Sequence, residues 1–179
     1  KYLKFVVFEI GIISKQFFMQ KLLEINDVKD LVQNLKSAQK KIVLVGGCFD
    51  ILHKGHIAFL NKAKVQGDIL LVMLESDESV KKRKGEKRPI HSQIDRANIL
   101  SSISSVDYIL LLPHLKTDLE YYNLVKTIEP DIIAVTENDP AYNNKVEQAK
   151  MVGGKVVEVV SLIPDYSTKK LAERIKDYV

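Results

Sequence analysis

The feature that most constrains the fold is a regular alternation of short apolar runs with amphipathic segments from about residue 26 onward. The apolar runs predict buried strands, and the segments between them have the spacing of helices. Strands that alternate with helices form a parallel sheet with helices on both faces. The pattern therefore predicts an α/β fold, a doubly wound Rossmann-like sheet of about five parallel strands, with ligands at the carboxyl ends of the strands. The predicted strands span residues 41–45, 69–74, 108–112, 131–135 and 155–160.

Turn and capping residues separate the predicted helices from the strands. Asn26-Asp27 and Ser92 are predicted helix starts, because their short polar side chains can cap free backbone N–H groups. Pro130 is predicted to mark a helix end, and Gly153-Gly154 breaks the helix before the last strand. The predicted helices begin near residue 26, span residues 55–65, 92–102, 118–128 and 140–151, and end with a helix that starts at Ser167.

The composition is that of an ordinary globular domain. Apolar residues make up 46% of the 179 residues and charged residues 28%, which excludes disordered and fibrous classes. We predict a single domain over residues 19–179, preceded by an extension of uncertain origin over residues 1–18. Lys4 and Glu9 interrupt that extension, so it lacks the ~18 apolar residues of a membrane-spanning helix. The single cysteine, Cys48, excludes an internal disulfide framework and favours a cytoplasmic location, with no membrane partner.

Much of the net charge of +4 is concentrated in one segment. Residues 81–88 hold six cations and one anion, in what the pattern predicts to be a loop after the second strand. Such a cluster attracts phosphate, although a solvated loop is the simpler interpretation. Nucleic-acid binding is not predicted, because no aromatic residue that could stack on a base lies between Phe59 and Tyr108.

A glycine turn and two histidines follow the first predicted strand. Gly46-Gly47 lets the backbone approach a ligand closely, and free amides there can bind phosphate. His53 and His56 lie three residues apart where a helix begins, so both rings can face one point beside a helix end that attracts anions. We interpret them as donors to phosphate. A zinc site, which would need further ligands, and two structural histidines are the alternatives.

At these residues the chain resembles a known superfamily. Gly47-Cys48-Phe49-Asp50 followed by His53-Lys54-Gly55-His56 is similar to the signature of the HxGH nucleotidyltransferases. Within that superfamily the chain resembles the cytidylyltransferase-like group, and most closely the adenylyltransferase domain of ADP-heptose synthases. The similarity starts near Leu22 and returns in the same order as far as the segment that begins at Tyr166.

The resemblance implies roles for individual residues. The backbone of the glycine turn would hold a triphosphate, the histidines would stabilise the transition state, and a lysine of the basic run would reach phosphate. The implied catalytic residues are His53, His56 and Lys84. The implied nucleotide-binding residues are Gly47, Cys48, Phe49, His53, His56, Lys84, Arg96, Thr136, Glu137, Ser167 and Thr168. The implied acceptor-binding residues are Asp50, Lys81 and Arg96.

Three of these residues also have simpler interpretations. Asp50 could cap the turn that follows it, and Arg96 could be a surface residue of its helix. Ser167 could be an ordinary helix N-cap that needs no ligand.

The activity implied by the resemblance is transfer of a nucleoside monophosphate from ATP or CTP to a phosphorylated small acceptor, such as a sugar 1-phosphate, with release of pyrophosphate. Mg²⁺ would accompany the nucleotide, with no metal site built from the protein alone. AMP transfer is favoured, because Leu162-Ile163-Pro164-Asp165 stands where glycerol-phosphate cytidylyltransferases carry Arg-Thr-Glu-Gly. Members of the group commonly dimerise, so a homodimer is an expected state.

The acceptor and the donor base stay open at this point. Residues 135–140 differ from the Lys-Gly-Gly-Asp-Tyr segment of the heptose enzymes, and this loop would help to form both pockets. One alternative is a cytidylyltransferase for glycerol 3-phosphate or a similar acceptor. A second is an FAD synthase-like adenylyltransferase, which Tyr166-Ser167-Thr168 resembles. A third is a non-catalytic nucleotide sensor, although the presence of both His53 and His56 speaks against it.

Overall fold

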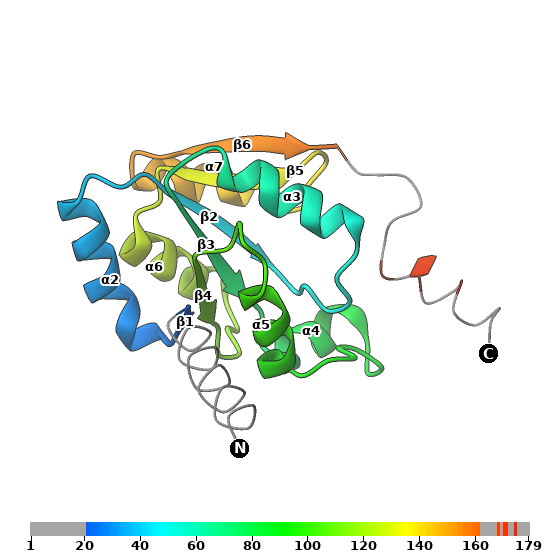
Figure 1. The fold of residues 1–179 in the computed structure, drawn as a ribbon. Helices are drawn as coiled ribbons and strands as arrows, with labels where there is room; N and C mark the ends of the chain where they lie inside the picture. Colours follow the sequence, from blue (N-terminus) through cyan, green and yellow to red (C-terminus); the bar gives the residue numbers. More distant parts are fainter. Residues whose placement is uncertain (1–20, 162–167, 169, 172–173, 175–179) are drawn as a thin grey trace, which may run out of the picture.

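A computed structural model describes residues 21–161, 168, 170, 171 and 174, and it contains a six-stranded parallel sheet (Figure 1). The strand order is β1-β4-β3-β2-β5-β6. The predicted doubly wound α/β fold is confirmed, but the predicted number of about five strands is wrong by one. The additional strand is β1, which pairs with β4 over only two residues and is too short to produce a sequence pattern. The strands are β1 Leu22–Leu23, β2 Ile42–Gly47, β3 Ile69–Leu74, β4 Tyr108–Leu111, β5 Ile132–Thr136 and β6 Lys155–Val160.

Helices cover both faces of the sheet, as the pattern predicted. Successive residues of β2 face opposite layers: Ile42 and Leu44 pack with α2, α6 and α7, whereas Val43 and Val45 pack with α3 and α5. Strands buried on both faces are near-continuous apolar runs, which explains the sequence of β2. The helices are α2 Ile25–Ser37, α3 Lys54–Lys64, α4 Asp77–Lys84, α5 Gln93–Ser101, α6 Asp118–Ile128 and α7 Tyr142–Met151.

The capping predictions are partly confirmed. Ser92 caps α5, because its hydroxyl accepts a hydrogen bond from the Asp95 N–H. Helix α2 begins earlier than Asn26-Asp27 predicted, with Glu24 at the N-cap position and its N–H bonded to the Asp27 carboxylate. The predicted extension, residues 1–18, and the predicted helix start at Ser167 both lie outside the described residues.

Residues 81–84 form the last turn of α4, so the prediction of a basic loop is wrong for this half of the segment. Ser76 caps the helix by accepting from the Ser79 N–H, and Asp77 and Glu78 occupy its first turn. Acidic residues at a helix N-terminus and basic residues at its C-terminus both stabilise the helix, because they interact favourably with its dipole. Gly85, with φ 96°, ends the helix in a conformation that costs a glycine little.

The sheet changes direction between β2 and β5. From β2 the chain builds outward through β3 and β4 on one side, and then crosses over to β5 and β6 on the other. Loops at the carboxyl ends of β2 and β5 therefore diverge, which leaves a crevice where doubly wound folds bind ligands. Of the helices in the described ranges, none is long and apolar enough to cross a membrane.

Candidate active site

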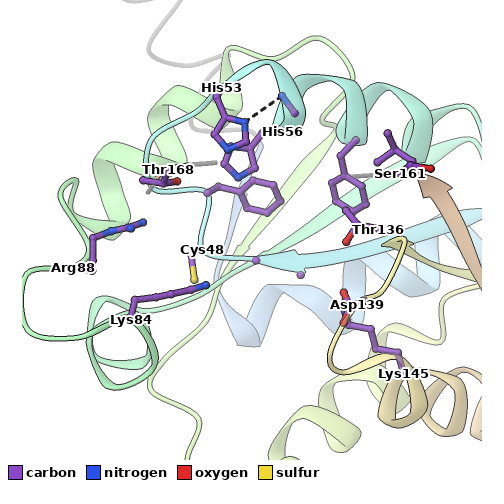
Figure 2. Close-up of a pocket in the computed structure, with 16 residues that line it drawn as sticks. Cys48, His53, His56, Lys84, Arg88, Thr136, Asp139, Lys145, Ser161 and Thr168 are labelled. Carbon is purple, nitrogen blue, oxygen red and sulfur yellow. Dashed lines mark hydrogen bonds and ion pairs between the residues drawn. The ribbon is translucent and has the colours of Figure 1, made fainter. Parts of the chain in front are cut away.

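A cavity of about 710 Å³ lies at the carboxyl ends of β2, β5 and β6, where the direction of the sheet changes (Figure 2). Side chains from both halves of the sheet line it. Eight of the residues implied by the resemblance lie on its wall: Gly47, Cys48, Phe49, His53, His56, Lys84, Thr136 and Thr168. The structure therefore brings together the glycine turn, the histidine pair, one basic lysine and the loop after β5.

The glycine turn owes its shape to Phe49. Phe49 has a φ of 45° and is 4% exposed, so its ring folds back beneath the turn into the core. A Cβ atom at Gly47 would lie 2.9 Å from this ring, closer than real Cβ atoms approach their neighbours. Glycine at this position lets the chain pass over the ring and leaves the backbone of Gly47 and Cys48 on the cavity wall.

The two histidines form a stacked pair at the N-terminus of α3. Their ring centroids are 3.9 Å apart, with an angle of 24° between the ring planes. His53 is the N-cap, and its Nδ1 accepts a hydrogen bond from the Gly55 N–H at 3.1 Å (Figure 2). Because Nδ1 is the acceptor, the proton of the neutral His53 ring is on Nε2, where it can be donated.

His56 is held in its neutral form. Burial lowers its pKa to about 4, and the neighbouring His53 contributes in the same direction. Its Nδ1 is buried and has no hydrogen-bond partner within the described part of the chain. A buried polar atom without a partner costs free energy. The backbone of Ile51 favours the charged form of His56, but burial outweighs it.

Asp50 does not line the cavity but orients a residue that does. Its side chain is 0% exposed, and it accepts hydrogen bonds from Arg88 Nε at 2.5 Å and from the Ile90 and His91 N–H groups. Burial opposes ionisation of Asp50, but the two backbone donors and Arg88 outweigh it and keep the pKa of Asp50 below its usual value. Asp50 therefore fixes the basic segment as a charged anchor.

Arg88 is a cavity residue that the sequence did not single out within its basic segment. Its Nε is bound by Asp50, whereas its two terminal nitrogens have no partner among the described residues. Lys84 lies near it on the wall and likewise forms no ion pair in the described part of the chain. Both cations are therefore available to an anion in the cavity. Lys81, in contrast, pairs with Glu86 at 2.6 Å and lies away from the wall.

Arg96 is buried under the site and contacts three loops. It is 0% exposed, and it donates to the carbonyl groups of Cys48, Glu75 and His91 and to the Asp77 carboxylate. It is thus not the surface residue that was the simpler interpretation, and it lies behind the cavity wall. Its role in binding nucleotide or acceptor stays a prediction. Its contacts join the glycine turn to the N-terminus of α4.

A second anchor holds the other end of α4. Glu75 is 5% exposed and accepts hydrogen bonds from the Tyr121 hydroxyl, and its carboxylate pairs with Arg83 at 2.7 Å. Burial and the nearby Glu75 raise the pKa of Tyr121 to about 12, so this hydroxyl remains a donor. Because Arg83 precedes Lys84 in the last turn of α4, this contact helps to position Lys84 at the cavity.

The opposite wall comes from β5, β6 and α7. Thr136 ends β5, and Ser161 follows β6. Asp139 and Lys145 form an ion pair of 2.8 Å on this wall, which the sequence did not indicate because their contact depends on how α7 returns to the loop. The Glu137 N–H donates to the Val160 carbonyl, and its side chain is not among those on the wall. Ser167 lies outside the described residues.

The described part of the wall carries more positive than negative charge. Lys84, Arg88 and Lys145 face it, and Asp139 is its one carboxylate within that part of the chain. Across the described ranges, no group of three or more His, Cys, Asp or Glu residues is arranged to hold a metal ion. The chemistry of the wall is that of a site for phosphate groups.

Comparisons with known proteins point to one family. The family model described as "Cytidylyltransferase-like" matches residues 44–176. "Bifunctional protein HldE" of Helicobacter pylori (strain Shi470) is 42% identical over 152 residues, which are 83% of this chain and 30% of that protein. The protein of the same name from Campylobacter jejuni (strain NCTC 11168) is 39% identical over an alignment of 182 positions, gaps included, which covers 96% of this chain and 37% of that protein.

Solved structures agree with the fold. A lipopolysaccharide core biosynthesis protein from Thermoplasma volcanium GSS1 has a TM-score of 0.51 and 28% identity, over 69% of this chain and 97% of its own. A pantoate-beta-alanine ligase from Francisella tularensis, solved with a β-γ ATP and β-alanine, has a TM-score of 0.56 over 88% of this chain and 77% of its own. At 17% identity, the ligase shows likeness of fold alone.

The fold, the family match and the relatives agree on the class of protein to which this chain belongs. The chain belongs to the cytidylyltransferase-like family, as its glycine turn and histidine pair predicted. It spans about a third of the length of the HldE proteins that it matches.

Proposed function

We propose that the protein is a cytoplasmic adenylyltransferase that transfers AMP from ATP to a phosphorylated small acceptor, with a heptose 1-phosphate as the first candidate. The observation that carries this proposal is the meeting of a stacked histidine pair with two cations on one cavity wall. Lys84 forms no ion pair within the described part of the chain, and Arg88 binds Asp50 through Nε alone. The resemblance to ADP-heptose synthases supports the sugar phosphate and the similarity to HldE proteins agrees with it. The single cysteine supports the reducing compartment.

The proposed reaction is a single in-line displacement. An oxygen of the acceptor phosphate attacks the α-phosphorus of ATP, the bond from that phosphorus to the β-phosphate oxygen breaks, and pyrophosphate leaves. No covalent intermediate with the protein is needed. Burial raises the pKa of the Cys48 thiol, so this residue of the wall stays protonated and is a poor nucleophile.

The protein contributes position and charge. His53 and His56 can donate hydrogen bonds to the non-bridging oxygens, on which negative charge grows in the transition state. The backbone of the glycine turn and the N-terminus of α3 add further donors. Two anionic reactants repel each other, so Lys84 and Arg88 lower the cost of bringing them together.

The two sides of the cavity favour one orientation of the reactants. Figure 2 shows Lys84 and Arg88 on one side, Thr136 and Asp139 on the other, and the histidines above them. The charged groups of Lys84 and Arg88 suit the acceptor phosphate. The hydroxyl groups and the paired charges of the β5 side suit the ribose and base of the nucleotide. We therefore place the acceptor beside α4 and the nucleoside beside β5.

Mg²⁺ fits this site as a companion of the nucleotide. The single carboxylate on the described wall, Asp139, is already paired with Lys145, so the triphosphate itself would supply most of the ligands. When bound, the ion neutralises charge on the departing pyrophosphate. Chelation with EDTA is expected to abolish turnover, and restoration by added Mg²⁺ is the check.

The test is pyrophosphate release, with ATP and CTP each crossed against a panel of phosphorylated acceptors. The panel contains a heptose 1-phosphate, other sugar 1-phosphates, glycerol 3-phosphate and flavin mononucleotide. We expect release with ATP and a sugar 1-phosphate, and loss of release in His56→Ala. Release with CTP and glycerol 3-phosphate alone would replace the proposal with a cytidylyltransferase. Nucleotide binding without release from any pair would favour a sensor.

A further inference from the structure

The Asp139–Lys145 pair is a polar feature of the cavity wall that takes no part in the proposed phosphoryl-transfer step. Asp139 lies in the loop after β5, and Lys145 lies in α7. Their 2.8 Å ion pair is partly buried, with side chains 16% and 21% exposed, respectively. The second oxygen of Asp139 accepts from the Ala141 N–H at 2.8 Å, so the carboxylate is held by both neighbours.

Both members of the pair retain capacity for a ligand. An ionised carboxylate can accept about four hydrogen bonds and an ammonium group can donate three. The described contacts use two of the former and one of the latter. The wall therefore presents an acceptor directly beside a donor, next to the hydroxyl-bearing Thr136 at the end of β5.

We propose that Asp139 and Lys145 recognise the base of the donor nucleotide and select one that carries an amino group. Asp139 accepts from the exocyclic amine, and Lys145 donates to the adjacent ring nitrogen. Adenine and cytosine both place an amine next to an acceptor nitrogen, whereas hypoxanthine and uracil place a carbonyl oxygen there. This inference rests on the proposed function only in taking a nucleoside triphosphate as the ligand.

The physical basis of the selection is repulsion as well as attraction. A keto base would set its carbonyl oxygen against the Asp139 carboxylate and leave a desolvated charge without a partner. Charge-assisted hydrogen bonds are stronger than neutral ones, and one good base contact of this kind discriminates by roughly 10- to 100-fold. We expect ATP to bind more tightly than ITP by that factor, and CTP more tightly than UTP.

The experiment is equilibrium binding of ATP, ITP, CTP, UTP and GTP, each with Mg²⁺ and without acceptor, to the whole chain. The two test variants are Asp139→Asn and Lys145→Met. The first keeps the oxygen that accepts from Ala141, and it replaces the other with an amide donor. The matched controls are Asp118→Asn and Lys150→Met, which change exposed residues outside the cavity. Circular dichroism and thermal unfolding establish that each variant is folded.

The readout is the ratio of the ITP and ATP dissociation constants. We expect this ratio to fall to about one, or below, in Asp139→Asn and to stay at its wild-type value in both controls. In Lys145→Met, ATP binding should weaken by roughly 10-fold. A merely structural role would weaken ATP and ITP by the same factor, because they share ribose and triphosphate, and would leave the ratio unchanged.

Three results would overturn the inference. They are equal binding of ATP and ITP by the wild-type chain, an unchanged ratio in Asp139→Asn, and binding of GTP more tightly than ATP. A His56→Ala protein separates this inference from the proposed function. If that protein lacks turnover but keeps the ATP preference, both stand. If the wild-type chain prefers ATP yet releases no pyrophosphate with any acceptor, base recognition stands and the proposed reaction fails.

Discussion

Two imidazole rings whose centroids are 3.9 Å apart cannot both be positively charged at low cost. Burial and the neighbouring ring keep His56 neutral in the absence of a ligand, and His53 is fixed in one tautomer by the Gly55 N–H. A triphosphate changes that balance, since negative charge favours protonated imidazole. If a triphosphate binds as proposed, we expect the pair to gain positive charge on binding.

The first prediction concerns catalysis by His56. In His56→Ala the turnover number should fall by about 10²–10³, equivalent to roughly 3–4 kcal/mol of transition-state stabilisation. The affinity for ATP should change much less. Steady-state kinetics with the preferred acceptor measure both quantities, and thermal unfolding checks the fold. Wild-type turnover in this variant would remove His56 from the mechanism.

The second prediction concerns pH. The pKa of His56 falls from 6.5 to about 4 on folding, so between these values the unfolded chain binds a proton that the folded chain does not. The free energy of unfolding should therefore decrease as pH falls from 6.5 to 4, by about 2 kcal/mol after allowance for partial exposure. Urea unfolding of His56→Gln should lack this component. His91→Gln, whose side chain makes no hydrogen bond in the described structure, is the control, and equal pH dependence in both variants would contradict the assignment.

Among the elements, α4 shows how a charged helix is placed against a cavity. Arg96 holds the N-terminus of α4 through Asp77. Glu75 holds the C-terminus of α4 through Arg83. Lys84 is thereby presented to the cavity. The positions of Arg83 and Arg88, and with them Lys84, are thus set by contacts with the buried carboxylates of Glu75 and Asp50.

The third prediction tests this arrangement. Replacing the buried arginine in Arg96→Met leaves three backbone carbonyl groups without their donor, which should lower the free energy of unfolding by about 2–4 kcal/mol. Weaker ATP binding should accompany this loss, because the glycine turn and α4 are no longer joined. Urea unfolding and nucleotide titration measure the two effects. Lys82→Met, an exposed change in α4, should alter neither, and a loss below ~1 kcal/mol in Arg96→Met would contradict this role.

The sequence predicted regular elements better than it predicted contacts between them. The strand 69–74 and the helix 118–128 were placed to the residue, because their apolar periodicity and capping residues are local signals. The glycine turn and the histidine pair were also predicted from local signals, because their residues lie close together in the chain. Arg88, Asp139 and Lys145 were missed, because each reaches the cavity through packing between segments far apart in the chain. The composition and the residue spacing of the sequence do not predict contacts of this kind.

At the scale of the whole molecule, the cavity joins the two halves of the sheet. β2 and β5 meet over the register pairs Val43 with Ile132 and Leu44 with Ile133. The cavity wall lies beyond this junction and takes residues from both sides. A ligand that bridges the wall should therefore stabilise the contact between the halves, not only the loops that touch it.

The fourth prediction concerns the stability of the folded chain with nucleotide bound. Saturating Mg²⁺-ATP, at about 100 times its dissociation constant, should raise the free energy of unfolding by about 2.7 kcal/mol. For a chain of this size that corresponds to a rise in melting temperature of roughly 5–11 °C. Differential scanning fluorimetry measures the shift, with Mg²⁺ and sulfate alone as controls. No shift at these concentrations would mean that Mg²⁺-ATP does not bind the folded chain in preference to the unfolded chain.

The strand order also affects which strand edges are exposed while the chain is being synthesised. β2 lies inside the finished sheet, yet its partner β5 is translated some ninety residues later, as the positions of Ile42 and Ile132 show. During synthesis one side of β2 is consequently an open edge, which can pair with other nascent chains. The segment that covers this edge also supplies Thr136, Asp139 and Lys145 to the cavity. One segment of the chain therefore both covers the edge of β2 and completes the cavity wall.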